Sequence, residues 1–191
     1  FIDEISTSNN KQFIITFDDG YKDLIANSLP ILKKYNFKAT CFVVSNLIGK
    51  TNSWDEENKN ILKKKLMDSD DICLWIKNGM KVGSHSKNHL NFKNIEYEIM
   101  LNEITESKNY LENLINNSVD SFCYPYGYFN EKILAEVKKI YSFAFTTKRS
   151  RYDESTHDKY LLPRIDMGKK MSNFKIYLKL NTPYEDFKYE N

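Results

Sequence analysis

The chain has 191 residues, of which 41% are hydrophobic and 28% are charged, and its 28 basic and 26 acidic residues leave a formal net charge of +2. This length suits one domain with a substantial core, and the composition is too polar for a protein that spans a membrane. The near balance of charge excludes the strong basic footprint of nucleic-acid-binding proteins. We expect one domain, no nucleic-acid partner and no membrane span, and the oligomeric state stays open.

Three cysteines lie far apart, at Cys41, Cys73 and Cys123, and none belongs to a Cys-x-x-Cys pair. This spacing argues against a disulfide framework and against a cysteine zinc site. The sequence begins at Phe1 rather than Met. We therefore expect an N-terminal segment to be missing from it, and any signal peptide would lie in that segment.

The first half of the chain alternates between strand and helix patterns. Short apolar runs predict buried strands, and apolar residues spaced three and four apart predict helices. In chain order we expect a strand at 12–17, a helix at 23–35, a strand at 39–44, helical segments at 61–66 and 70–77, and a strand at 81–84.

The second half continues this alternation. A long helix is predicted by apolar residues at helical spacing that we expect in the core: Tyr97, Leu101, Ile104, Leu111, Leu114 and Ile115. Further elements are strands at 121–124, 143–146 and 161–165, and a helix at 131–140. Repeated strand–helix–strand order implies parallel strands joined by crossover helices, hence an α/β sheet or barrel with its chemistry at the carboxyl ends of the strands.

Two carboxylates follow the first predicted strand, in Thr16-Phe17-Asp18-Asp19-Gly20. Such a run is commonly only a turn, because aspartate hydrogen-bonds nearby backbone and glycine accepts positive φ. Here an apolar strand delivers both carboxylates to its end, where one could face a metal ion and the other a water molecule. The residues leave both interpretations open.

Two histidines, His85 and His89, stand four residues apart after the strand at 81–84. Neutral imidazoles and one carboxylate suit a hydrolytic zinc ion that keeps open positions for water and substrate. The alternative is a pair of structural histidines without function. Because the chain has only three histidines, two of them at this spacing behind a strand favour a metal site.

The third candidate motif is Phe122-Cys123-Tyr124-Pro125-Tyr126-Gly127. As structure alone it is a strand that ends in a proline-glycine turn. As part of a site, Pro125 would fix the backbone and Gly127 would allow close approach. The amide N–H of Tyr126 could then point at a developing oxyanion.

Together these motifs resemble those of the NodB-like polysaccharide deacetylases, the carbohydrate esterase family four hydrolases that remove acetyl groups from N-acetylated sugars. Residues 16–20, 85–89 and 124–127 resemble the first, second and third family motifs, and the order fits over about Phe13 to Asp166. The resemblance implies an α/β fold of the distorted (β/α) barrel type and a single deacetylase domain over 1–191.

Carried over by residue, the resemblance implies Asp18 as general base and Asp19, His85 and His89 as metal ligands. The Tyr126 amide becomes an oxyanion donor. The implied mechanism is attack of a metal-bound water on the acetamide carbonyl. Zinc is the expected cofactor, and cobalt or nickel would suit the same ligands.

One departure from the family pattern is Cys123, which stands where the third motif commonly carries an arginine that pairs with the base. We expect Arg164, in Leu162-Pro163-Arg164-Ile165-Asp166, to supply that cation. An arginine fork suits a carboxylate and would keep Asp18 ionised.

The other departure concerns the general acid, a late histidine in the common family arrangement. The remaining candidate, His157, lies in a polar loop-like stretch, where a surface histidine is the favoured interpretation. The Tyr-Pro-Tyr-Gly and Leu-Pro-Arg-Ile runs look like the poly-N-acetylglucosamine deacetylase branch, whose acid histidine precedes the first motif. In that case the acid would lie before Phe1.

The sequence thus predicts a metal-dependent enzyme that removes N-acetyl groups from a polysaccharide containing N-acetylhexosamine at the bacterial cell envelope. The alternatives are an O-acetyl esterase or cyclic-imide hydrolase on the same metal, and a glycan-binding module with weak activity. Four aromatic residues are further candidates. Trp75 is expected in the core, Trp54 is open between core and sugar face, and Tyr21 and Tyr128 are candidate groove residues.

Overall fold

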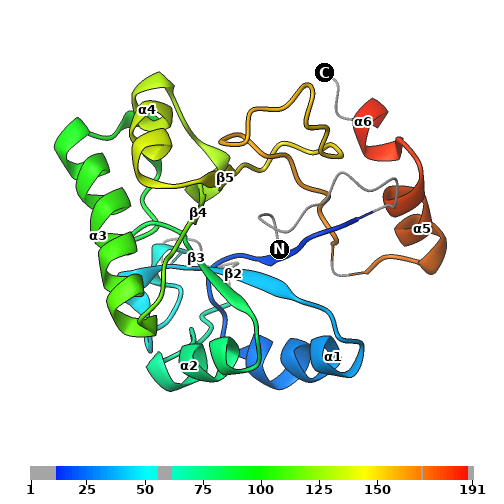
Figure 1. Cartoon of the computed structure of the whole chain (residues 1–191), viewed down its shortest axis with the longest axis horizontal. Helices are drawn as coiled ribbons and strands as arrows, with labels where there is room; N and C mark the ends of the chain where they lie inside the picture. Colours follow the sequence, from blue (N-terminus) through cyan, green and yellow to red (C-terminus); the bar gives the residue numbers. More distant parts are fainter. Residues whose placement is uncertain (1–11, 56–61, 169, 189–191) are drawn as a thin grey trace.

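The computed structural model describes residues 12–55, 62–168 and 170–188. Its centre is one parallel sheet whose spatial order follows the sequence order. The strands are β1 (Ile15–Phe17), β2 (Ala39–Val43), β3 (Lys81–Ser84), β4 (Ser121–Cys123) and β5 (Phe143–Phe145). Each strand pairs in parallel with the next, and the connection between them crosses over outside the sheet. The sheet curls into part of a barrel (Figure 1). The expected α/β fold of the distorted barrel type is therefore confirmed.

The described chain has six α-helices: α1 (Leu29–Lys34), α2 (Ser69–Lys77), α3 (Tyr97–Ile115), α4 (Glu131–Ile140), α5 (Asn173–Asn181) and α6 (Tyr184–Lys188). A π-helical turn, η2 (Leu24–Ser28), leads into α1, and short 3₁₀ turns occur at η3 (Ser45–Leu47), η4 (Ser53–Asp55), η5 (Phe92–Asn94) and η6 (Pro125–Gly127). In Figure 1, α1 and α2 lie along one side of the sheet and α3 and α4 along another, whereas α5 and α6 stand apart near the C-terminus. Within the described residues, no helix is both long enough and apolar enough to cross a membrane.

β2 and β5 are almost entirely apolar because both faces of the sheet are covered. On the outer face, residues such as Cys41 and Val43 pack against the helices, where Trp75 is fully buried as expected. Leu111 and Ile104 of α3 join this layer, but Tyr97 is 42% exposed, so its expected place in the core is wrong. Its hydroxyl instead donates to Glu136 of α4, which is favourable for an amphipathic side chain at a helix start.

The inner face holds a small separate cluster of Phe42, Cys123, Phe145 and Leu162. Gly83 on β3 makes room for it, since a Cβ at this position would lie 2.4 Å from ring atoms of Phe42. The barrel interior is therefore filled by side chains, and polar chemistry is confined to its rim.

The chain after β5 covers the gap between the last strand and the first. Leu162 forms a single parallel bridge with β5. Pro163 has no N–H to continue the pairing, so the strand expected at 161–165 is reduced to this bridge. The side chain of Arg164 then reaches across to β1, where it donates to Thr16 Oγ1 at 3.4 Å.

The helical segment expected at 61–66 is wrong where the structure describes it, and Ile61 itself lies outside the described residues. Lys65 and Leu66 instead form antiparallel bridges with Thr51 and Tyr21. The spacing of Leu62 and Leu66 fits a helix, but backbone pairing with two neighbouring segments overrides this local preference.

Candidate metal centre

The candidate residues lie at the carboxyl ends of three strands of the parallel sheet, β1, β3 and β4. Asp18 and Asp19 follow β1, His85 follows β3, and the turn containing Tyr126 follows β4. Because the strands are parallel, these ends meet at one edge of the sheet. The fold thus brings residues that are far apart in the sequence together in one site.

The backbone at this edge is unusually constrained. Six non-glycine residues in the described chain have positive φ, and four of them belong to this edge: Asp19 (72°), Ser86 (64°), His89 (59°) and Tyr126 (57°). Left-handed backbone at such residues costs about 1–3 kcal/mol each unless the surroundings hold it in place. This clustering indicates that the fold sets side-chain directions here at the expense of local stability.

Asp19, His85 and His89 bring three potential ligand atoms together. Asp19 Oδ1 lies 3.4 Å from His85 Nε2 and 3.5 Å from His89 Nε2, and both imidazoles are buried. These separations are long for hydrogen bonds. They match the roughly 3.4 Å between ligands that each lie about 2.1 Å from one tetrahedrally bound zinc ion. The three residues therefore fit a divalent metal.

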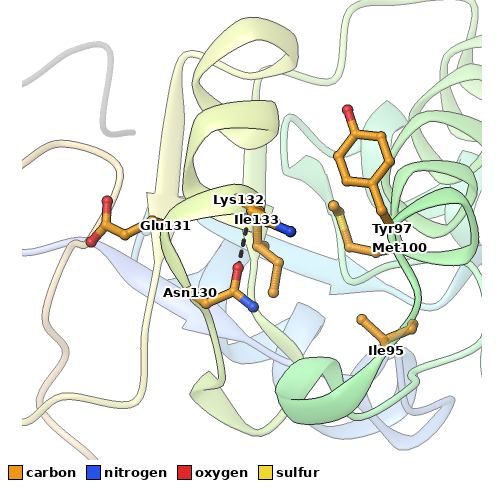
Figure 2. Close-up of a pocket in the computed structure, with 7 residues that line it drawn as sticks. All are labelled: Ile95, Tyr97, Met100, Asn130, Glu131, Lys132 and Ile133. Carbon is orange, nitrogen blue, oxygen red and sulfur yellow. Dashed lines mark hydrogen bonds between the residues drawn. The ribbon is translucent and has the colours of Figure 1, made fainter.

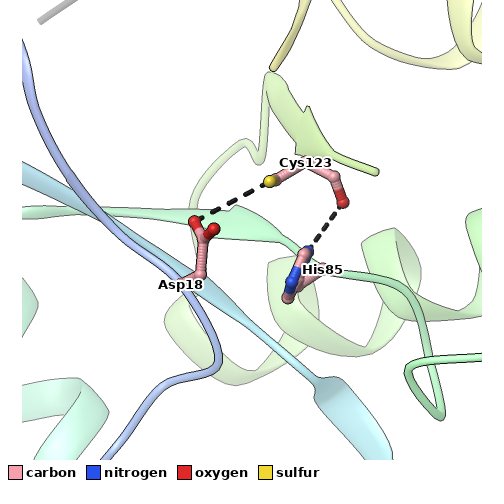
Figure 3. A group of neighbouring side chains, drawn as sticks. All are labelled: Asp18, His85 and Cys123. Carbon is pink, nitrogen blue, oxygen red and sulfur yellow. Dashed lines mark hydrogen bonds between the residues drawn. The ribbon is translucent and has the colours of Figure 1, made fainter. Parts of the chain in front are cut away.

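A backbone carbonyl orients the ring of His85. Its Nδ1 lies 2.7 Å from the carbonyl oxygen of Cys123 and donates to it (Figure 3), which fixes the ring with Nε2 facing Asp19. Burial opposes protonation of His85, but Cys123 and Asp19 outweigh it and raise its pKa. The Asp19 and Asp18 carboxylates both contribute to this rise, and burial raises the pKa of the Cys123 thiol itself.

The ring of His89 is neutral. Burial, together with the nearby His85, lowers its pKa to about 3. Its Nδ1 is buried and has no hydrogen-bond partner among the described residues. The ring instead lies between two aromatic side chains, Trp54 at 4.5 Å and Tyr126 at 4.6 Å between ring centroids. A neutral imidazole is the form that binds a metal.

Asp18 is paired with Arg164 by two parallel hydrogen bonds. Arg164 Nη1 donates to Oδ1 at 2.7 Å and Nη2 to Oδ2 at 2.8 Å, while its Nε donates to Thr146 O at 2.9 Å. Burial would raise the pKa of Asp18, but these hydrogen bonds and the guanidinium charge outweigh it, and the pKa is lowered. The structure thus holds an ionised carboxylate beside the metal cluster.

Cys123 lies where the guanidinium and the carboxylate meet. Its Sγ is 3.3 Å from Arg164 Nη2. The same atom is 3.7 Å from Asp18 Oδ1, as Figure 3 shows. Asp18, His85 and Cys123 also lie close enough to form a metal-binding group. This group is the poorer candidate, because Asp18 is already paired with Arg164 and the thiol is protonated.

The turn from His85 to His89 is braced by buried polar residues of α3. Glu103, which is 2% exposed, accepts hydrogen bonds from the backbone N–H of Asn88 at 2.7 Å and from its side-chain amide. Ser107 donates to Ser86 O at 3.0 Å. Sequence reasoning missed this role because α3 was interpreted as core packing only. The available signal was a pair of polar residues, four apart, beside the apolar stripe of the helix.

The turn at η6 presents Tyr126 at the edge of the site. Gly127 there has φ +73°, and an added Cβ would lie 2.0 Å from Thr147 Oγ1, so the position requires glycine. The Tyr126 ring is 43% exposed and Tyr128 lies beside it, with 6.5 Å between centroids. An exposed aromatic rim therefore adjoins the metal cluster.

Two other candidate residues, His157 and Tyr21, contact residues outside the metal cluster. The hydrogen bonds of His157 are with Ser150, Asp153 and Thr156 of its own loop. Tyr21 forms the bridge with Leu66 and lies under the ammonium group of Lys64. The structure places neither residue in the cluster.

A pocket of about 400 Å³ opens between the starts of α3 and α4 (Figure 2). Its lining residues are Ile95, Tyr97, Met100, Asn130, Glu131, Lys132 and Ile133. The Asn130 side chain accepts from the Ile133 N–H and so caps α4. None of the lining residues belongs to the metal cluster, and the pocket is distinct from it.

Comparison with known proteins identifies the family of this chain. A family model described as polysaccharide deacetylase matches residues 6–141. A putative polysaccharide deacetylase of Bacillus subtilis is 28% identical over 165 residues, covering 86% of this chain and 54% of the relative. The poly-β-1,6-N-acetyl-D-glucosamine N-deacetylase of Staphylococcus epidermidis is 32% identical over 160 residues, covering 79% and 53%. The chain thus spans about half the length of these curated relatives.

Solved structures share the fold. The deacetylase PplD of Streptococcus pyogenes, in complex with acetate, has a TM-score of 0.75 at 24% identity and covers 88% of this chain and 70% of that one. A polysaccharide deacetylase of Bacillus cereus has a TM-score of 0.75 at 23% identity, with coverages of 90% and 52%. At these identities the likeness establishes the architecture.

Proposed function

The chain belongs to the polysaccharide deacetylase family, and from that premise we propose that it is a metal-dependent hydrolase that removes N-acetyl groups from an N-acetylhexosamine polysaccharide of the cell envelope. The observation that carries the proposal is the Asp19, His85 and His89 cluster beside the ionised Asp18. The name of the Staphylococcus epidermidis relative supports a poly-N-acetylglucosamine chain as substrate. The deacetylase domain is proposed to extend over residues 1–191.

Asp19, His85 and His89 would hold the metal ion through one carboxylate oxygen and two Nε2 atoms. Zinc is the proposed ion, since two imidazoles and a carboxylate with open positions suit it, and cobalt or nickel would fit the same ligands. When bound, the ion supplies Lewis-acid chemistry, which activates water and polarises the acetamide carbonyl. His85 keeps its ligand tautomer through the Cys123 carbonyl.

Asp18 is the proposed general base. Its pKa is held low by Arg164, so it is ionised at neutral pH and ready to accept a proton from the attacking water. The bidentate pair also fixes the carboxylate in one orientation. Arg164 thereby takes the role that a motif arginine would have at the position of Cys123.

The Tyr126 backbone amide is the proposed oxyanion donor. Its left-handed backbone, between buried Pro125 and the obligatory glycine, sets its direction independently of the side chain. The water oxygen bonds to the carbonyl carbon, and the C–N bond of the acetamide then breaks. Acetate and an amine leave, and the proton that the water gave up balances the charge on the amine nitrogen.

Acetate release from partly N-acetylated glucosamine oligomers tests this function. Wild-type protein is expected to release acetate, and Asp18→Asn, which preserves the shape of the side chain but removes the base, is expected to lose that activity with zinc still bound. O-acetylated sugars are tested in parallel. Acetate from O-acetyl sugars alone would overturn the proposal in favour of an esterase, and oligomer binding without any acetate would favour a binding module.

A further inference from the structure

The two histidines of the metal cluster are held in different ways. His85 has the usual arrangement, in which the second ring nitrogen donates to a carbonyl and fixes the plane of the ring. His89 has no hydrogen bond at Nδ1 among the described residues, although this atom is fully buried. Among the described residues, the plane of His89 is therefore held by contacts other than a hydrogen bond at Nδ1.

Aromatic contacts provide that constraint. Trp54 stacks on His89 with 4.5 Å between ring centroids and 30° between the planes. Tyr126 meets the same ring edge-on at 4.6 Å and 67°. Only the Trp54 contact is stacked, so it is the one that resists tilting of the imidazole.

The turn that carries Trp54 is anchored to the body of the protein. Asn52, which is 2% exposed, accepts from Lys64 N at 2.6 Å and donates to Leu62 O at 3.2 Å. Thr51 forms an antiparallel bridge with Lys65 just before this point. The indole is thus presented by a fixed turn, η4, rather than by a loose loop.

We propose that Trp54 is a positioning residue of the metal centre, whose stacked indole holds the plane of His89 in place of a hydrogen bond at Nδ1. The inference rests on the proposed function only in that it takes Asp19, His85 and His89 as the metal ligands. It assigns a role to a residue that lies outside all three sequence motifs. Trp54 then sets the affinity for the metal, whatever the substrate.

Zinc affinity, measured by competition with a chromophoric chelator on metal-stripped full chain, tests the proposal. Trp54→Ala is expected to weaken zinc binding by about 10-fold or more, the usual cost of losing the partner that orients a metal ligand. Trp54→Phe keeps an aromatic face and is expected to stay within about threefold of wild type. Tyr128→Ala removes an aromatic residue from the same rim and is expected to leave zinc affinity unchanged.

Fluorescence gives a second readout that a general loss of stability would not imitate. The chain has two tryptophans, and Trp75 is fully buried behind the sheet. Cobalt added to the stripped protein is expected to quench the emission of wild type with one-to-one saturation. Most of that quenching should vanish in Trp54→Phe, although this variant still binds the ion.

Equal zinc affinity in wild type and Trp54→Ala would overturn the inference, as would an equal loss in Tyr128→Ala. Quenching that survives in Trp54→Phe would also contradict it, because the quenched residue would then be Trp75. If wild type itself fails to bind zinc, the proposed function fails first. The two failures are therefore distinguishable.

Discussion

Two regions build the site by different means: the turn from His85 to His89 and the segment from 161 to 166 that carries Arg164. The histidine turn is tied to α3 by two hydrogen bonds: the Asn88 N–H donates to Glu103, and the Ser107 hydroxyl donates to Ser86 O. The other segment is held to β5 and the residues after it by backbone hydrogen bonds at Leu162 and Arg164, and the Arg164 side chain then reaches the site. The comparison indicates that the proposed metal ligands are held by packing against α3, whereas the ionisation of the proposed base depends on one arginine side chain from a later segment.

The strongest way to break the first region is to remove a ligand. His89→Ala is expected to abolish stoichiometric zinc binding and to lower acetate release by more than about 100-fold, since only two ligands remain. Metal analysis of the purified variant and the acetate assay measure the two effects. His157→Ala is the matched histidine control for metal content, and its zinc content should equal that of wild type. Retention of one zinc by His89→Ala would exclude it as a ligand.

The second region is tested by Arg164→Lys. A lysine ammonium cannot form two parallel hydrogen bonds to a carboxylate, so turnover is expected to fall about 10- to 100-fold with zinc still bound. Steady-state kinetics on the zinc-loaded protein measure this loss. Arg151→Lys changes a surface arginine that pairs with Asp186 and serves as control. Unchanged turnover in Arg164→Lys would remove Arg164 from the account.

The pH profile sharpens the same comparison. Burial pushes the pKa of Asp18 up and Arg164 pushes it down, with the lowered value as the net result. The base of wild type is therefore ionised throughout the neutral range. Arg164→Met removes the two largest contributions that lower this pKa while burial still raises it, so the acid limb of kcat/KM should move to higher pH. An acid limb at the wild-type position would show that Arg164 does not control the base.

A smaller effect is expected from removing Glu103, which accepts hydrogen bonds from the histidine turn; we call this contact the brace. Glu103→Ala leaves the Asn88 N–H without its acceptor, which should lower the free energy of unfolding by about 1–3 kcal/mol and weaken zinc binding by about 10-fold. Glu103→Gln keeps one acceptor oxygen and should lose less. Chemical denaturation and chelator competition measure both quantities. Glu106→Ala, on the exposed face of the same helix, is the control. Glu103→Ala that behaves like this control would show that the brace contributes nothing.

The smallest effect is expected from the surface pair between Arg149 and Asp166, at 2.9 Å with both side chains substantially exposed. Asp166→Asn should change the free energy of unfolding by less than about 1 kcal/mol, because the backbone carbonyl of Asp166 still accepts from Lys179. Acetate release should stay within twofold of wild type. A large loss of turnover would mean that this pair, rather than the barrel, holds Arg164 in position.

The sequence predicted those parts of the fold that repeat a local pattern. The alternation of strands and helices and the family motifs gave the parallel barrel, and the family match confirms the resemblance. The segment around Lys65 and Leu66 was mispredicted because its pairing with Thr51 and Tyr21 is set by tertiary contacts. Local spacing carries no information about such partners.

The sequence predicted those site residues that belong to short motifs. Asp18, Asp19, His85 and His89 each follow a strand, and the parallel order brings them to one edge. The contributions of Glu103 and Trp54 depend on buried contacts between segments far apart in sequence. No periodicity marks these contacts, so they emerge only from the folded structure.

The central claim is that acetate release depends on one metal ion held by Asp19, His85 and His89. Its most direct test strips the protein with a chelator, then adds zinc in steps while acetate release from N-acetylglucosamine oligomers is measured. The account predicts no activity in the stripped protein and recovery that saturates at one zinc per chain in wild type, with no recovery in His89→Ala. Full acetate release by the stripped protein, or equal recovery in His89→Ala, would contradict it.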